Sequence, residues 1–315
     1  MTSAAATWSG EGLFHEALLY ETDADLRARV VPFVEEGLAG GQAVFAVAGP
    51  RVRSVLQDHL GSEVVRLALF VDADEAWVGA GQMLAFWRDT VQAQADAGAP
   101  CRLLAEPTWM AHPWGSTWNR YEAVCNDLFG GAPCYSLCVH DRRVVPQSLL
   151  DEALRVHPLS WDGSRTVPSP GYQHTDEFLR SVEPPWSLPP ASRECQVVSA
   201  PVEARSLVAS ALSAATEEAL RDDVTLAVNE LVANAITAAG SAEVSHWRQG
   251  DAMVWEVSDV GPGMHATAAG YAPPPADQLG GRGLWIARTL ADEAVVRPWG
   301  PGTAIRLYFP ASRPS

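Results

Sequence analysis

Two polar residues on one predicted helix are the first feature of the sequence that could do chemistry. The segment "DDVTLAVNELVANAITAA", residues 222–239, repeats apolar residues at helical spacing. We expect its apolar stripe to contain Leu226, Val228, Leu231, Val232, Ala235 and Ile236. Glu230 and Asn234 lie one turn apart, so their side chains project together from one face. An acid and a carboxamide placed there could transfer a proton or hold a cation, although alone they also fit an ordinary polar stripe.

Glycine-rich segments farther along the chain favour a phosphate-binding site. In "VSDVGPGM", Asp259 ends a predicted strand and is followed by Gly261 and Gly263. In "LGGRGLWIARTLAD", a second group of glycines directly precedes a predicted helix: Gly280, Gly281 and Gly283. Glycine permits a positive φ and a close backbone approach, and a helix N-terminus presents N–H groups to phosphate oxygens. A further segment, "GPGTAIRLYF", places Thr303 on a returning strand. Hairpins and caps also use glycine, but the four segments in this order predict nucleotide binding.

These segments resemble the GHKL (Bergerat-fold) ATP-binding domain, in its compact anti-sigma-factor and serine-kinase subfamily. The matching pieces are an N box in "NELVANAI", a first glycine box in "SDVGPGM", a second in "GGRGL", and a final "GTAIRLYF". The resemblance covers the C-terminal third of the chain. It implies an ATP site that contains Mg²⁺.

The resemblance also implies a role for each matching residue. Asn234 would hold Mg²⁺, Glu230 would orient or deprotonate the attacking water or hydroxyl, and Asp259 would accept a hydrogen bond from the adenine amino group. The others would surround the nucleotide: Gly261 and Gly263 by making room, Gly281 and Gly283 with backbone donors, Arg282 with charge, and Thr303 at the adenine end. Mg²⁺ takes hard oxygen ligands, so an amide oxygen can bind it while the carboxylate one turn earlier acts as a base.

The chain departs from its subfamily at several points. Many relatives carry a histidine near the position of Thr237. The segment between the glycine boxes, residues 265–279, is short and proline-rich, and we expect it to form a lid. Sensor histidine kinases need a phospho-accepting histidine on a helix before this domain. His157 is followed directly by proline and His174 lies in a proline-rich seam, so neither resembles such a histidine.

The elements that must position these residues fall into two folded regions joined by a proline-rich linker. We expect domains at residues 10–165 and 195–312, and the linker at 166–194. The first region alternates strands with amphipathic helices, which predicts an α/β domain with three layers around a mostly parallel sheet. Its expected strands are 16–20, 43–49, 64–71, 100–107 and 134–141. The second region predicts two helices with a break near residue 222, a hairpin turning at 249–251, a helix at 283–292 and a second hairpin at 293–310. That order indicates an α/β two-layer sandwich, as in the GHKL fold.

The first region resembles the MEDS (methanogen/methylotroph sensory) domain, which precedes this ATPase type in RsbA-type anti-sigma regulators. The pieces that carry this resemblance are "FHEALLY", "VVPFVEEGLAGGQAVFAV", "RLLAEPTW", "RYEAVCNDLF" and "YSLCVHD". Polar and aromatic residues fall near strand ends or helix starts, where open α/β sheets bind ligands: His15, Glu106, Trp109, Tyr121, Glu122, Cys138 and His140. Taken singly, each is better explained as a buried core residue. Cys134, Cys138 and His140 share one strand face, and we expect buried thiols there, not a metal site.

Composition excludes several classes of function. The formal charge of −16 argues against direct binding to nucleic acid. All 22 basic residues are arginines, so mechanisms that need a phosphate-loop or Schiff-base lysine are excluded. The 5 cysteines, an odd number, are expected as reduced thiols. Neither a secretion signal nor a membrane-spanning run is visible, so we expect a cytoplasmic protein.

The leading hypothesis is a two-domain signalling regulator. By resemblance, it sequesters a sigma factor and uses ATP and Mg²⁺ to phosphorylate a serine or threonine of an antagonist (anti-anti-sigma) protein. Phosphorylation would keep the antagonist from displacing the sigma factor. Two alternatives stay open: an ATP-dependent partner-binding switch without kinase activity, and a histidine-kinase-like ATPase that acts without a partner. Relatives of the ATPase domain often pair, which leaves a homodimer open.

Overall fold

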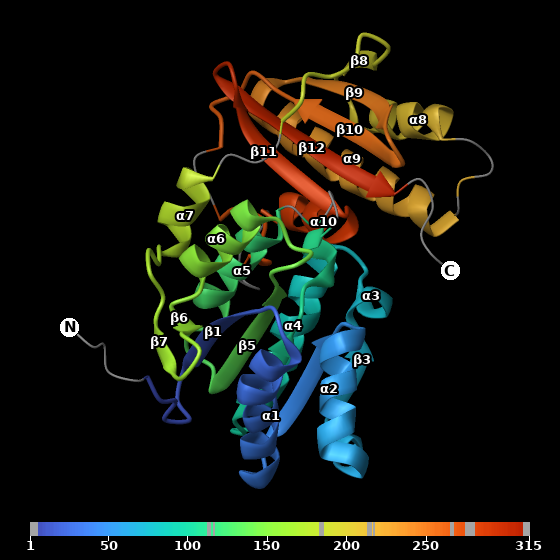
Figure 1. Ribbon diagram of the computed structural model, residues 1–315. Helices are drawn as coiled ribbons and strands as arrows, with labels where there is room; N and C mark the ends of the chain where they lie inside the picture. The colour runs from blue at the N-terminus through green and yellow to red at the C-terminus, as the bar shows by residue number, and fades with distance from the viewer. Residues whose placement is uncertain are drawn as a thin grey trace. The chain divides into compact units, whose positions relative to one another are not determined.

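The computed structural model describes residues 6–111, 115, 117–182, 186–212, 216, 218–264, 268–274 and 281–310. The chain forms two compact units (Figure 1). The first comprises Met1–Trp77 and Phe86–Ser181, and the second comprises Val78–Ala85 and Val182–Ser315. No helix in these described ranges is both long enough and apolar enough to cross a bilayer.

The first unit is built on a seven-stranded sheet in the order β3-β2-β4-β5-β1-β6-β7. Its strands are β1 (Leu13–Tyr20), β2 (Ala43–Ala48), β3 (Leu69–Asp72), β4 (Cys101–Ala105), β5 (Cys134–Asp141), β6 (Leu159–Trp161) and β7 (Thr166–Pro168). Every neighbouring pair is parallel except β6 with β7. The predicted mostly parallel sheet is therefore confirmed.

Helices cover both faces of this sheet, as continuous apolar strands require. On β5, Tyr135, Leu137 and Val139 point to one face and join a core with α1 (Asp23–Ala39) and α2 (Pro50–Leu60). The alternate residues, including Cys138, point to the opposite face, toward α4 (Ala80–Asp96) and α5 (Trp118–Leu128). Smaller helices complete the unit: α3 (Ala73–Ala76), α6 (Gln147–Val156), α7 (Thr175–Ser181) and two 3₁₀ helices, Gly61–Arg66 and Thr108–Ala111.

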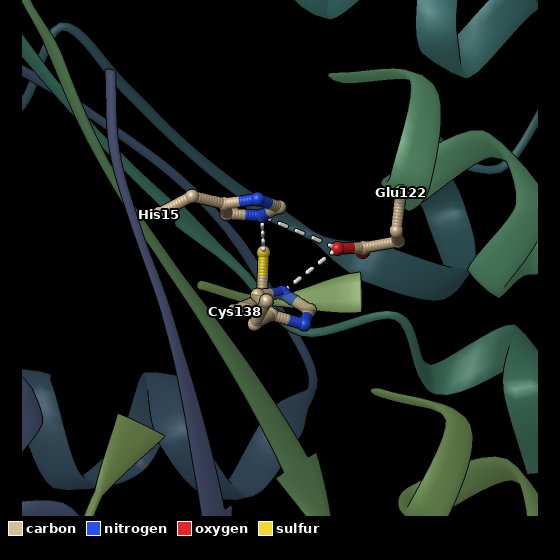
Figure 2. A group of neighbouring side chains, drawn as sticks. His15, Glu122 and Cys138 are labelled. Carbon is tan, nitrogen blue, oxygen red and sulfur yellow. Dashed lines mark hydrogen bonds and ion pairs between the residues drawn. The ribbon is translucent and has the colours of Figure 1, made fainter. Parts of the chain in front are cut away.

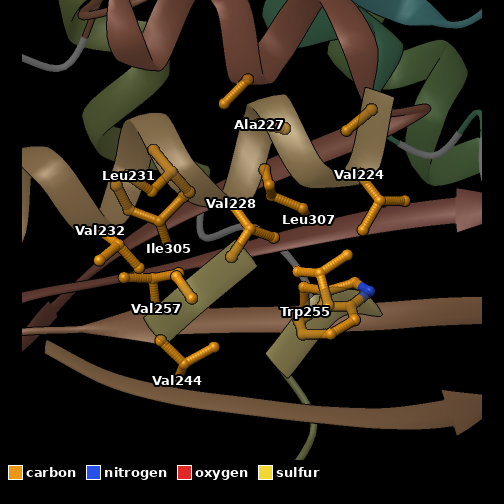
Figure 3. Close-up of a cluster of buried hydrophobic side chains, with 14 of the residues drawn as sticks. Val224, Ala227, Val228, Leu231, Val232, Val244, Trp255, Val257, Ile305 and Leu307 are labelled. Carbon is orange, nitrogen blue, oxygen red and sulfur yellow. The ribbon is translucent and has the colours of Figure 1, made fainter. Parts of the chain in front are cut away.

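The second unit is a two-layer sandwich, as predicted. Its sheet is antiparallel throughout, in the order β11-β12-β10-β9-β8. The strands are β8 (Glu194–Val198), β9 (Ala242–Gln249), β10 (Ala252–Ser258), β11 (Glu293–Trp299) and β12 (Gly302–Pro310). The helices are α8 (Pro201–Ala211), α9 (Glu218–Ala239) and α10 (Gly283–Leu290). Figure 3 shows the core between the layers, where Val228 and Leu231 of α9 meet Trp255, Val257 and Leu307 of the sheet.

Three sequence expectations about elements were wrong in detail. Residues 64–66 belong to a 3₁₀ helix, and the strand expected there begins only at Leu69. The break between the two long helices falls between Ala211 and Glu218, so the acidic residues near 222 lie inside α9. Leu226 is 45% exposed, because the buried stripe of α9 runs through Val224 and Ala227 instead.

The boundary between the units lies later than the start of the predicted linker. Residues 166–168 form β7, which pairs with β6, and Thr175–Ser181 form α7. Phe178 and Leu179 of α7 are buried, and the Thr175 hydroxyl donates a hydrogen bond to the carbonyl oxygen of Ala123. Single apolar residues among prolines are therefore enough to attach this segment to the first unit. They have no periodicity that the sequence would reveal.

Candidate functional site

Helix α9 sets the position of the predicted acid–amide pair. Its buried side fixes the rotation of the helix on the sheet and turns Glu230 and Asn234 to the edge of the core. Glu230 is half-buried and Asn234 is exposed. Ala238, a further turn along, continues the same face. A polar pair at the border between core and solvent can meet a ligand without burying a charge.

The second glycine group lies directly against this pair. Gly283 is the first residue of α10, and a Cβ atom added there would lie 2.6 Å from Asn234 Nδ2 and 3.2 Å from Glu230 Oε2. The preceding Arg282 is exposed at the N-cap, and Gly281 has φ +79°, which favours glycine. The N-terminus of α10, which has no side-chain cap, therefore lies next to Glu230 and Asn234 on α9.

The first glycine group surrounds Asp259, just after β10. The Asp259 N–H donates to the Thr303 carbonyl oxygen at 2.9 Å, and the Gly261 N–H donates to Asp259 Oδ1 at 2.8 Å. These bonds fix both the backbone and the carboxylate. Gly263 has φ +77°, so it too is placed where glycine is needed.

Gly302 is a site residue that the sequence analysis missed. A Cβ atom there would lie 2.1 Å from the Asp259 carbonyl oxygen. Glycine at the start of β12 therefore lets the Asp259 turn approach the strand. The "GPG" before Thr303 was a usable signal, but it reads equally well as a hairpin turn.

Both glycine groups meet the same face of α9. A Cβ atom on Gly261 would lie 3.0 Å from the Ala238 Cβ, one turn beyond Asn234. The structure thus brings Glu230, Asn234 and Gly283 together at one end of this face, and the turn of Asp259 and Gly261 to the other. Residues 265–267 and 275–280, which include Gly280 and much of the predicted lid, lie outside the described residues.

The arrangement fits a magnesium-bound nucleotide. Because Gly283 has no side chain, the start of α10 lies directly against an amide and a carboxylate. The amide oxygen of Asn234 is a ligand of the kind that Mg²⁺ takes. At the far end, Asp259 offers an oriented carboxylate, which can accept a hydrogen bond from an amino group.

Comparison with known families agrees with this geometry. Residues 197–309 match the family model for the histidine kinase-like ATPase domain. Residues 14–158 match the model for MEDS, the methanogen/methylotroph, DcmR sensory domain. The chain joins a MEDS sensory domain to a histidine kinase-like ATPase domain. This architecture is that of a signalling ATPase, and it agrees with the RsbA-type arrangement that the sequence resembles. A search of curated proteins found no match.

Replacing Gly283 with alanine should weaken nucleotide binding by the ATPase domain without unfolding it. The added Cβ would collide with Asn234 Nδ2, the end of a side chain that can swing away at little cost. Alanine also favours a helix over glycine by about 1 kcal/mol. We expect the affinity for Mg-ATP to fall at least about tenfold, a loss of about 1.4 kcal/mol, at an unchanged melting temperature. Calorimetric titration with Mg-ATP measures this, and an unchanged affinity would contradict the placement of α10.

The MEDS domain has a small pocket at the carboxyl ends of its central strands. It encloses about 140 Å³ and is lined in part by Tyr20, Glu106 and His140. Glu106 is buried, accepts a hydrogen bond from the Tyr20 hydroxyl at 2.5 Å, and accepts another from the Gly49 N–H at 2.7 Å. Burial raises the pKa of Glu106 to about 7 and lowers the pKa of His140 to about 3. The pocket therefore combines a carboxyl group that titrates near neutrality with a neutral imidazole.

The other candidates of this domain divide into two groups. Trp109 and Tyr121 are buried core residues, and Trp109 stacks on Trp77 with ring centroids 4.6 Å apart. Both fit the packing role expected for them singly. His15, Glu122 and Cys138, in contrast, converge on one point together with His157. His140 lies beside this point, with its ring centroid 5.7 Å from that of His157.

Glu106 should make the stability of the protein fall as the pH rises. Its folded pKa of about 7 exceeds the ordinary 4.5, so the stabilisation is complete below 4.5 and is lost as the pH rises through about 7. The shift corresponds to about 3 kcal/mol. Glu106→Gln cannot titrate, so its free energy of unfolding relative to the natural protein should rise between pH 5 and pH 8. Urea denaturation at several pH values measures this difference. A difference in the free energy of unfolding that does not change with pH would contradict the prediction.

Proposed function

We propose that this protein is an ATP-binding anti-sigma factor that phosphorylates a serine or threonine of an antagonist protein under the control of its MEDS domain. The observation that carries the proposal is the meeting of Glu230, Asn234 and Gly283 at the start of α10. The partners follow from the resemblance to RsbA-type regulators: a sigma factor and its antagonist. The formal charge of −16 suits a protein partner better than a nucleic acid.

The residues of the site divide the work of phosphoryl transfer. Bound Mg²⁺ would neutralise charge on the phosphates. Asn234 would hold that ion through its amide oxygen. Glu230, one turn away, would accept the proton of the attacking hydroxyl. Asp259, oriented by the Gly261 N–H, would recognise the adenine amino group.

Two upstream histidines, His157 and His174, are poorly placed to accept a phosphoryl group. His157 is buried at the end of α6, where its Nδ1 bonds the Ala153 carbonyl oxygen, so an approaching nucleotide could not reach it. His174 is exposed but precedes the seven-residue helix α7, which is too short to form a dimerising helix.

A phosphotransfer assay tests the proposal. The full chain is incubated with Mg²⁺, γ-labelled ATP and candidate antagonist proteins, with Glu230→Gln as the matched control. Label on a serine or threonine of one antagonist, lost with the variant, is the expected result. Nucleotide binding without transfer would indicate the partner-binding switch instead, and phosphate release without any partner would indicate a free-standing ATPase.

One departure from the subfamily supports the alternative function, an ATP-dependent partner-binding switch without kinase activity. Thr237 stands near the position where many relatives carry a histidine. Its hydroxyl donates to the Ala233 carbonyl oxygen of the same helix at 2.8 Å. The Thr237 hydroxyl is therefore bonded within its own helix, and Thr237 supplies no imidazole to the site. Phosphotransfer would then depend on Glu230 as the base.

A further inference from the structure

Four ligand-type side chains converge inside the MEDS domain. They are His15 on β1, Glu122 on α5, Cys138 on β5 and His157 at the end of α6. All four are buried, and one ligand atom of each lies within 4.8 Å of the others. Figure 2 shows His15, Glu122 and Cys138 pointing toward one another, with dashed lines from the Glu122 carboxylate to two imidazole rings. We propose that this cluster, hereafter the four-ligand cluster, binds a zinc ion.

The separations between the ligand atoms suit a tetrahedral ion. In a tetrahedron, two ligand atoms lie about 1.6 bond lengths apart, which for zinc bonds is roughly 3.3 to 3.8 Å. His15 Nε2 lies 3.5 Å from Cys138 Sγ and 3.4 Å from Glu122 Oε2. His157 Nε2 lies 3.0 Å from Glu122 Oε2. The remaining separations do not exceed 4.8 Å, so the side chains must draw closer together around an ion at the centre.

Hydrogen bonds outside the cluster aim the correct atom of each ring inward. His157 Nδ1 lies 2.7 Å from the Ala153 carbonyl oxygen, which can only accept, so Nδ1 carries the proton. His15 Nδ1 lies 2.9 Å from Asn126 Oδ1, and the Asn126 amide N–H₂ donates to Val156, which fixes its orientation. In each neutral ring Nε2 then has a lone pair directed at the cluster. Such outer bonds are the usual support of metal-bound histidine.

The remaining outer contact orients the carboxylate in the same way. The Trp118 indole N–H donates to Glu122 Oε1, which leaves Oε2 facing the rings. If both rings are neutral, the Nε2 lone pairs of His15 and His157 face Glu122 Oε2. All three atoms are then hydrogen-bond acceptors. Glu122 Oε2 and His157 Nε2 are both buried and lie 3.0 Å apart, so the pair needs either a proton or a cation between its two atoms. A cation between them satisfies both atoms.

A divalent ion can take the place of ring protons in this cluster. The ring centroids of His15 and His157 lie 4.1 Å apart, so two imidazolium charges would repel each other in a dry interior. One Zn²⁺ instead balances one carboxylate and one thiolate. Zinc accepts this mixture of nitrogen, oxygen and sulfur ligands in four-coordinate sites. The ion would tie β1, β5, α5 and the end of α6 together, and this role is independent of the nucleotide site proposed above.

The experiment measures zinc on the full chain, purified without a histidine tag. The protein is stripped with a chelator, reloaded with zinc or cobalt, and freed of excess ion by gel filtration. We expect one tightly held zinc ion per chain by elemental analysis. We also expect cobalt to give the visible bands of a tetrahedral site together with a thiolate-to-cobalt charge-transfer band. The chelator should lower the melting temperature by roughly 10 °C.

Matched variants locate the ion. Cys138→Ser should abolish the charge-transfer band and the zinc content, whereas Cys134→Ser, which alters an equally buried thiol of the same strand, should keep both. His157→Gln should also abolish the zinc content. A natural protein that holds no zinc and shows no cobalt–thiolate band would overturn the proposal, even if a variant failed to fold. Equal loss in both cysteine variants would also overturn it.

Discussion

Replacing Asn234 with alanine should abolish the binding of Mg-ATP and leave the ATPase domain folded. The amide is the proposed metal ligand on α9, and the start of α10 lies directly against it because Gly283 has no side chain. Loss of a residue that merely supports a metal ligand costs about 10- to 100-fold in affinity, so we expect a loss of at least about 100-fold here. Asn234 is exposed, so the melting temperature should not change.

Asn229→Ala is the control for this experiment. It removes the same side chain from the same helix, but Asn229 accepts a hydrogen bond from Arg205 on α8 and lies outside the site. Calorimetric titration with Mg-ATP should therefore give an unchanged affinity for Asn229→Ala. If Asn234→Ala binds Mg-ATP as well as the natural protein does, the metal assignment is wrong.

Replacing Glu230 with glutamine should remove turnover and preserve nucleotide binding. Glutamine keeps the size of the side chain but cannot accept a proton, and a positioned general base contributes about 10²- to 10⁴-fold to a rate. Glu230 is half-buried beside Gly283, so the substitution leaves the packing of α10 unchanged. The readouts are the rate of phosphate transfer or release and, separately, the affinity for Mg-ATP.

Asp222→Asn provides the comparison for Glu230→Gln. Asp222 is an exposed acid near the start of the same helix, so its neutralisation removes an equal charge far from the glycine groups. Its turnover should match that of the natural protein. A Glu230→Gln variant that retains full turnover would show that another group takes the proton.

The ATPase domain was predicted from the order of its motifs and their resemblance to the GHKL domain, and local periodicity indicated which residues share a face. Helix and strand spacing alone determine which residues share a face, so Glu230 and Asn234 could be paired before any fold was known. The glycines near Asp259 and before α10 mark places where a Cβ would collide, and that restriction is visible as a residue type. The structure places Gly261 and Gly283 against one face of α9, which is consistent with the predicted order of segments.

Features without periodicity were not predicted from the sequence. Gly302 resembles any hairpin glycine until Asp259 is seen next to it. The proline-rich stretch contains α7, which is held by a few buried contacts such as Phe178 and not by an amphipathic repeat. Likewise the helix break was expected at a charged cluster, yet α9 accommodates those residues on its outer face. In each case the deciding contact comes from another part of the chain.

The sequence by itself determined the two-domain organisation, the strand and helix alternation, and the residue types of a nucleotide site, because these depend on neighbours within a turn or a strand. The four-ligand cluster was decided only by the tertiary structure. His15 and Cys138 are separated by 123 positions, and they face each other because β1 and β5 pair in parallel with one register. In the sequence, strand alternation placed Cys134 and His140 on one face with Cys138, where buried thiols and not a metal site were expected. Which of them meets Glu122 and His157 depends on how α5 and the end of α6 pack over that face, and this packing leaves no mark in local spacing.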